Sequence, residues 1–101
     1  MSKDIRIRPD GFVVREGWWH RKSVKWSAVM AIHARRIDRV TYDEIFLIFE
    51  LSDGKSISVG ELDKGFAMFR EALADAFADM EANWHSLAEA YAGTPVQVWQ
   101  A

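Results

Sequence analysis

The residue types best suited to binding chemistry crowd into residues 18–26, which hold three tryptophans and four basic side chains. Flat apolar rings beside cations suit a lipid interface, where the rings insert and the cations meet headgroup phosphates. The same residue types anchor protein interfaces. Trp26 begins an apolar run, so we expect it to pack in the core. The candidate binding residues are Trp18, Trp19, Arg21, Lys22 and Lys25.

A second basic patch follows along the chain. Arg35 and Arg36, with Arg39, precede a turn at Tyr42. We interpret Arg35 and Arg36 as the polar rim of either kind of site, lipid or protein. Nothing in the residue pattern decides between the two.

The chain offers little on which catalysis can rest. It contains no cysteine, no Gly-x-Ser-x-Gly nucleophile elbow, no glycine-rich phosphate loop, and no histidine and carboxylate at the close spacing of a metal site. Its three histidines, His20, His33 and His85, stand isolated in the sequence. We therefore predict a non-enzymatic protein with no metal and no cofactor.

Charge is distributed unevenly along the chain although the net charge is only -2. Residues 1–40 hold ten Lys and Arg against four Asp and Glu, whereas residues 41–101 hold three against eleven. Such a split suits self-complementarity, within one domain or with a second copy, or a basic face for an acidic partner. Nucleic acid is an unlikely partner, because the sequence pI of about 5.9 lies below the values typical of nucleic-acid-binding domains.

Alternating residues predict strands in the first part of the chain. Residues 3–16 are typical of a hairpin, with Ile5 and Ile7 alternating with arginines and Asp10-Gly11 as the turn. The run 45–51 is apolar at consecutive positions, so it should be a central strand covered on both faces. Further strands are expected at the end of 18–26, over 27–37 and over 57–59.

Helical spacing takes over after Asp63, which we expect to cap a helix. The apolar residues that recur there at steps of three and four are Phe66, Phe69, Leu73, Phe77 and Met80. A second helix is expected over 82–92, with Tyr91 on its apolar stripe, and residues 96–99 should form an edge strand or tuck Trp99 against the core. Strands first and helices last predict an α+β fold in a single domain over 1–101.

Scattered positions resemble a known group of proteins. They are Trp26-x-x-Val29-x-x-Ile32-x-Ala34, Asp38, Tyr42-Asp43-x-Ile45-x-Leu47-x-Phe49, Glu61, Gly65-Phe66, Trp84 and Trp99. In these positions the chain is similar to small uncharacterised bacterial proteins with a pleckstrin-homology-like domain. The resemblance implies a strongly bent antiparallel sheet, a split barrel closed by a C-terminal amphipathic helix. The residues predict about six strands before that helix, where such domains have seven. A partly open barrel, or a plain sheet backed by two helices, is the alternative, because a second short helix follows.

The resemblance implies a fold and no activity, since this fold serves lipid, peptide and protein binding alike. Together with the residues, it predicts a cytoplasmic protein-interaction module that binds an unknown protein or a second copy of itself. The alternative is a peripheral binder of anionic lipid headgroups through the tryptophan and basic loop. No apolar run reaches the length of a membrane span, and the first residues are charged with no apolar leader after them.

Overall fold

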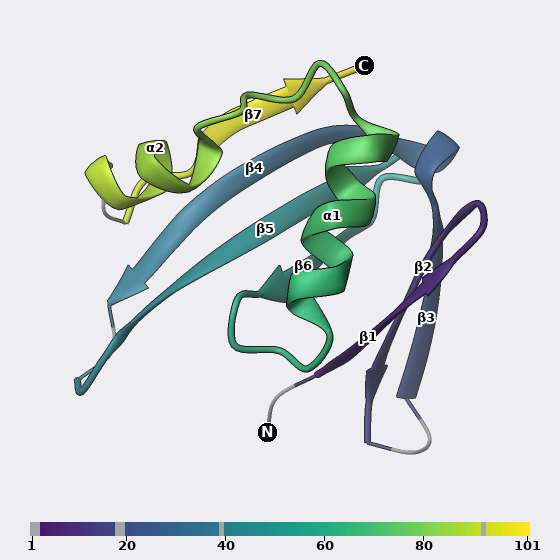
Figure 1. Cartoon of the computed structure of the whole chain (residues 1–101), viewed down its shortest axis with the longest axis horizontal. Coiled ribbons are helices and arrows are strands. Elements are labelled where there is room, and N and C mark those ends of the chain that lie inside the picture. Colours follow the sequence, from purple (N-terminus) through teal and green to yellow (C-terminus); the bar gives the residue numbers. More distant parts are fainter. Residues whose placement is uncertain (1–2, 18–19, 39, 92) are drawn as a thin grey trace.

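The first strands form a sheet of their own in the computed structural model of the chain, which describes residues 3–17, 20–38, 40–91 and 93–101 (Figure 1). Three antiparallel strands pair in chain order: β1 (Asp4–Arg8), β2 (Gly11–Glu16) and β3 (His20–Lys25). The predicted hairpin over 3–16 is confirmed, but its turn is formed by Pro9 and Asp10, one residue before the predicted Asp10-Gly11, because Gly11 already pairs with Arg8. Gly11 begins β2 where two backbones come close, since a Cβ there would overlap the Val24 carbonyl.

The second sheet is reached through a short 3-10 helix, η1 (Trp26–Ala28). Its four strands are β4 (Val29–Asp38), β5 (Asp43–Leu51), β6 (Ser56–Gly60) and β7 (Val96–Gln100). They lie side by side in the order β6-β5-β4-β7. The prediction that 45–51 forms an interior strand is confirmed, because β5 pairs with β4 on one side and β6 on the other. The edge strand expected near the C-terminus is β7.

The two antiparallel sheets do not close into a barrel. At the edge of β1, one short bridge joins this strand to the loop that follows β6, where Ile5 N donates to Lys64 O at 2.8 Å and Lys64 N donates to Lys3 O at 2.9 Å. A single bridge cannot extend a ladder, so β1 gains no full neighbouring strand on that side. The predicted α+β class is confirmed, and the pleckstrin-homology-like barrel stays a prediction.

The first helix, α1 (Phe66–Ala76), packs between the sheets (Figure 1). Its buried residues are Phe66, Phe69 and Leu73, at the predicted helical spacing. The Phe69 ring centroid lies 4.9 Å from that of Phe12 on β2 and 5.8 Å from that of Phe49 on β5. One aromatic side chain of the helix therefore joins the two sheets into a common core.

The start of α1 differs from the expected one. Its N-cap is Gly65, whose φ of 87° lies in the left-handed region, and not Asp63. The Asp63 carboxylate instead accepts hydrogen bonds from Lys3 N at 3.1 Å and Gly60 N at 2.7 Å. Asp63 is unavailable as a helix cap because two loop amides already occupy it, and the helix also ends before Met80.

The second helix, α2 (Trp84–Ala90), is shorter than the expected span. Trp84 and Ala88 are buried, whereas Tyr91, expected on the apolar stripe, is 57% exposed because the helix ends before it. Trp99 on β7 lies partly buried against the core, and its Nε1 donates to Asp79 Oδ1 at 2.7 Å.

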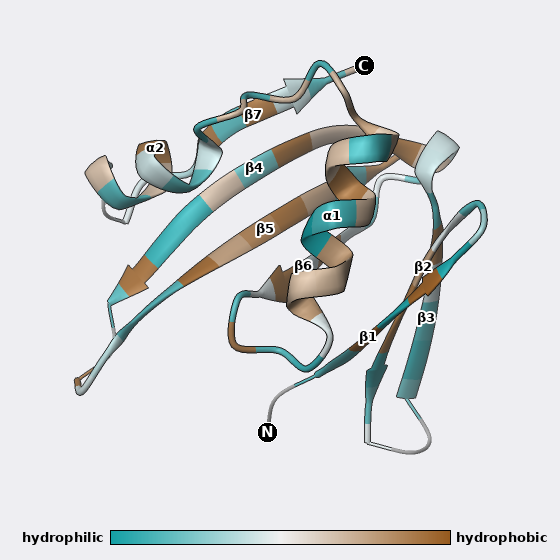
Figure 2. Ribbon diagram, viewed as in Figure 1, coloured by the Kyte–Doolittle hydropathy of each residue, from teal (hydrophilic) through white to brown (hydrophobic). Residues whose placement is uncertain are grey.

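The hydropathy of the residues differs between strands of the two sheets. Figure 2 shows hydrophobic colours along β5 and hydrophilic colours along much of β1 and β3. Within the described residues, no helix is long and apolar enough to cross a membrane.

Candidate binding surface

The three-stranded sheet has one apolar face and one basic face, because side chains alternate along a strand. Its inner face supplies Ile5, Phe12, Val14 and Val24, each no more than 5% exposed, to the core. The opposite face presents cations from all three strands. We call this surface the basic sheet face and define it by Arg6, Arg8, Arg15, Arg21 and Lys25.

The positive charge of the basic sheet face is poorly compensated. Asp4 lies on the same face, and its Oδ2 lies 3.3 Å from Arg6 Nε. Among the residues that the structure describes, no carboxylate forms an ion pair with Arg8, Arg15, Arg21 or Lys25. The sheet face therefore carries five cations against one carboxylate.

The strand register also places two of these cations against each other. Arg15 on β2 lies directly opposite Arg21 on β3. Trp26 N donates to Asp10 O at 2.9 Å, so these two residues form a hydrogen-bonded pair of the β2–β3 ladder. Bonded and non-bonded pairs alternate along an antiparallel ladder, so Arg15 and Arg21 form a non-bonded pair. Non-bonded pairs bring side chains closest together, and like charges there are unfavourable. Such an arrangement lowers the stability of the isolated sheet.

A pocket of about 350 Å³ opens on the other side of the same strands. It lies where β2 and β3 approach the start of β6, and Lys3 Nζ donates to Ser58 O at 2.9 Å beside it. Half-buried Lys22 faces this pocket from the position opposite Val14. The lining residues are Lys3, Val14, Glu16, His20, Arg21, Lys22, Lys55 and Ile57.

The structure separates the residues that the sequence grouped as one site. Arg21 and Lys25 lie on the basic sheet face and Lys22 lies on the other face of β3, although Arg21 and Lys22 both line the pocket. Trp18 and Trp19 lie outside the described residues. The expectation that Trp26 packs in the core is confirmed, with its ring centroid 5.2 Å from that of Phe12 and 5.6 Å from that of Phe77.

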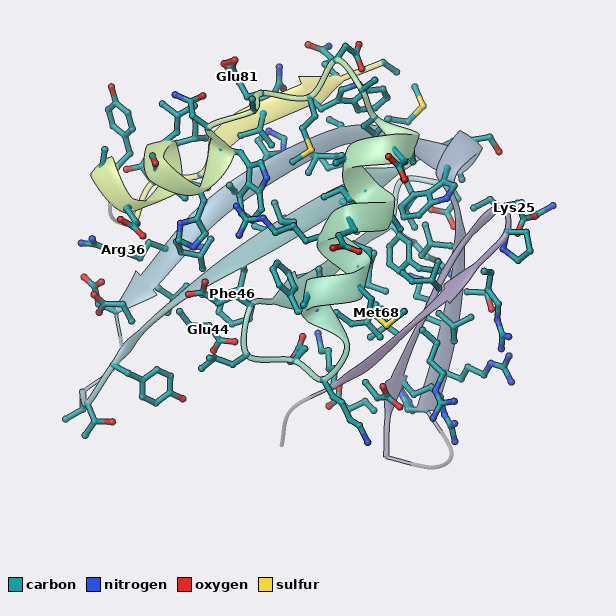
Figure 3. The ribbon with its side chains drawn as sticks, viewed as in Figure 1. Lys25, Arg36, Glu44, Phe46, Met68 and Glu81 are labelled. Atoms are coloured by element: carbon teal, nitrogen blue, oxygen red, sulfur yellow. The ribbon has the colours of Figure 1, made fainter. Side chains whose placement is uncertain are left out.

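Two residues of the second basic patch, Arg35 and Arg36, lie on the other sheet, and Arg39 lies outside the described residues. Arg35 and Arg36 belong to β4, and Figure 3 shows Arg36 on the side of the molecule opposite to Lys25. Arg36 holds the helix α2, since its Nη1 donates to Glu89 O at 2.9 Å. Its Nε lies 3.1 Å from Asp38 Oδ1, off the line of a hydrogen bond. Arg36 therefore has a structural role, while Arg35 is exposed.

Sequence reasoning missed part of the basic sheet face. Arg6, Arg8 and Arg15 were visible as the polar partners in the hairpin alternation, which is the signal that places them on one face. The missing information was the pairing of β2 with β3, which sets Arg21 and Lys25 beside them.

The prediction that His85 is isolated is wrong. Its Nε2 lies 3.0 Å from Glu61 Oε2 and its Nδ1 lies 3.1 Å from Glu89 Oε1. Glu61 also accepts a hydrogen bond from Ile45 N at 3.1 Å, so the cluster links α2 to β5. A His and Glu four residues apart on a helix share a face, which was the available signal. Among the described residues, no group of three or more His, Cys, Asp and Glu is arranged to hold a metal ion.

Comparisons with known proteins identify no relative of this chain. The chain matches no model of a protein family, no curated protein and no solved structure.

Proposed function

We propose that this protein is a non-enzymatic protein-interaction module whose basic sheet face binds an acidic surface of another protein. The observation that carries the proposal is the set of five cations, two of them directly opposed, with a single carboxylate among them. A neutralising partner would relieve the repulsion between Arg15 and Arg21 and gain ion pairs in return.

The composition of the face favours a protein over a lipid surface. Four of its five cations are arginines, whose planar guanidinium matches a carboxylate with two parallel hydrogen bonds. The one apolar residue on this face, Val13, is 2% exposed, so the described part of the face offers no side chain to insert between lipids. A sheet face that carries cations on three neighbouring strands suits the surface of a folded partner or an extended acidic segment.

A second copy of the chain is one possible acidic partner. The exposed side of α1 carries Glu71 and Asp75, and Asp79 follows the helix. A contact between this side of one copy and the basic sheet face of another would be head-to-tail, and it would continue into rings or open chains. Self-association of this kind raises the mass in light scattering as concentration rises, and high salt reverses it.

The test is affinity capture from a nuclease-treated native lysate with three baits. They are the wild type, the variant Arg8→Glu/Arg21→Glu on the basic sheet face, and the control Arg35→Glu/Lys55→Glu, which has the same net charge but changes exposed positions outside the basic sheet face. We expect proteins retained by the wild type and the control to be lost from the Arg8→Glu/Arg21→Glu bait and to elute with salt. The same proteins on all three baits would refute the proposal.

The pocket beside Lys22 supports a second candidate function, binding of an anionic lipid headgroup. Lys3, Lys22 and Lys55 line a space of about 350 Å³, which suits a compact phosphate-bearing group. We expect sedimentation with vesicles containing phosphatidylserine to exceed sedimentation with neutral phosphatidylcholine vesicles and to fall with salt. Equal sedimentation with both vesicle types would remove this candidate.

A further inference from the structure

The backbone of β3 has an open side, and the register shows which groups point there. Hydrogen bonding between Trp26 N and Asp10 O, at 2.9 Å, continues the register in which Gly11 faces Lys25. Backbone groups of a strand alternate between its two neighbours. The even-numbered residues of β3 therefore bond to β2, and the N–H and C=O groups of Arg21, Ser23 and Lys25 point away from the sheet.

The other sheet edges are covered at least in part. Lys64 bridges the edge of β1, Glu81 N donates to Val98 O of β7 at 3.0 Å, and Lys3 Nζ donates to Ser58 O of β6 at 2.9 Å. In the ranges that the structure describes, no backbone or side-chain group bonds to the outward side of β3. Figure 1 shows β3 at the margin of the molecule, with β2 as its neighbour in the sheet. An uncovered edge is a template for one more strand.

The charged side chains of β3 determine which kind of partner strand can pair with its open edge. Arg21 and Lys25 present cations on the basic sheet face beside their own outward backbone groups, and Lys22 adds a cation on the other face. Pairing with β3 of a second copy would bring these cations together, which is unfavourable. A strand with carboxylates at alternate positions would instead place them all on one face, beside Arg21 and Lys25.

We propose that β3 receives an extended acidic segment of a partner protein as the fourth strand of the first sheet. The backbone groups of Arg21, Ser23 and Lys25 supply the main-chain hydrogen bonds, and the cations of the basic sheet face select alternate carboxylates. This inference rests on the proposed function and specifies how the basic sheet face engages its partner.

The experiment uses Ser23, whose N–H points outward. Proline at this position removes that donor and places a ring at the open edge, while the ladder to β2 and the net charge are unchanged. The probe is a capped, fluorescent peptide that alternates glutamate with threonine, and binding is followed by anisotropy. The matched variant is Ser23→Ala, and circular dichroism with thermal unfolding shows whether each variant folds.

We expect the wild type and Ser23→Ala to bind the peptide with similar affinity, and Ser23→Pro to bind it about tenfold or more weakly. A peptide of the same sequence with alternate backbone amides N-methylated should also bind weakly to the wild type, which keeps the test valid if Ser23→Pro fails to fold.

Two results would overturn the inference in different ways. Equal, salt-sensitive binding of the plain and the N-methylated peptide would show attraction by charge alone, so strand addition would be wrong while the basic sheet face keeps its proposed role. No binding of the plain peptide to the wild type would reject strand addition outright, and the lysate capture would then decide the proposed function separately.

Discussion

The opposed pair Arg15 and Arg21 predicts that removing a charge from the basic sheet face will stabilise the isolated protein. The two arginines form a non-bonded cross-strand pair, the geometry in which side chains come closest. Arg21→Gln removes the repulsion, and Arg21→Glu replaces it with an attraction. The free energy of unfolding should therefore rise from wild type to Gln and again to Glu.

The magnitude follows from the position of the pair. Cross-strand pairs contribute about 0.2–1 kcal/mol, and Arg21 is exposed, so solvent screening keeps each step near about 0.3–0.5 kcal/mol. For a domain of this size, 1 kcal/mol shifts the midpoint of thermal unfolding by about 4–8 °C. The Arg21→Glu midpoint should then lie about 2–8 °C above that of the wild type at low salt.

Thermal unfolding at low and at high salt provides the measurement, with Arg35→Glu as the control. Arg35 lies opposite Phe46 on β5, so no cross-strand cation faces it. We expect the stabilisation by Arg21→Glu to shrink in high salt, because exposed charges are screened. A destabilised Arg21→Glu variant at low salt, or a gain that salt leaves unchanged, would refute the repulsion on which the proposed function depends.

Three further perturbations test the packing of the molecule, each by chemical denaturation. Phe69→Ala removes the ring that joins both sheets to α1, and we expect a loss of about 3–5 kcal/mol; a loss below 1 kcal/mol would contradict its central place. A double-mutant cycle of His85→Ala and Glu61→Gln should give a coupling of about 0.5–1.5 kcal/mol at pH 6, whereas additive effects would show that the 3.0 Å contact is not stabilising. Gly65→Ala should cost more than Gly54→Ala although both glycines have positive φ, because a Cβ on Gly65 would overlap the Ile5 carbonyl while Gly54 faces open space; equal losses would assign the cost to φ alone.

Local patterns in the sequence predicted the local elements. Alternation on both sides of Asp10-Gly11 identified the first hairpin, whose turn lies one residue earlier, and the spacing of Phe66, Phe69 and Leu73 identified α1. Both signals depend on residues that are close in the chain. Contacts between distant residues escaped the same reasoning, as with Asp63, whose carboxylate is taken by the amide of Lys3, sixty residues away.

The same difference between local signals and long-range contacts applies to the residues predicted to form the binding site. Arg21 and Lys25 share a face because they lie four residues apart on one strand, a relation that the sequence alone provides. Lys22 was grouped with them although strand geometry sends it to the opposite face, toward the pocket. The arginines of β1 and β2 entered the site only through strand pairing, which alternation within one strand does not determine.

The pairing of β7 with β4 has a consequence for the order of folding. Strands β4, β5 and β6 join through short connections, whereas the register that brings Trp99 beside Ile32 closes a loop of most of the chain. Loop-closure entropy delays such a long-range pairing until the local hairpins exist. Until β7 docks, the edge of β4 that it covers is open and includes the apolar residues Ile32 and Ala34, and an open apolar edge is a template for aggregation.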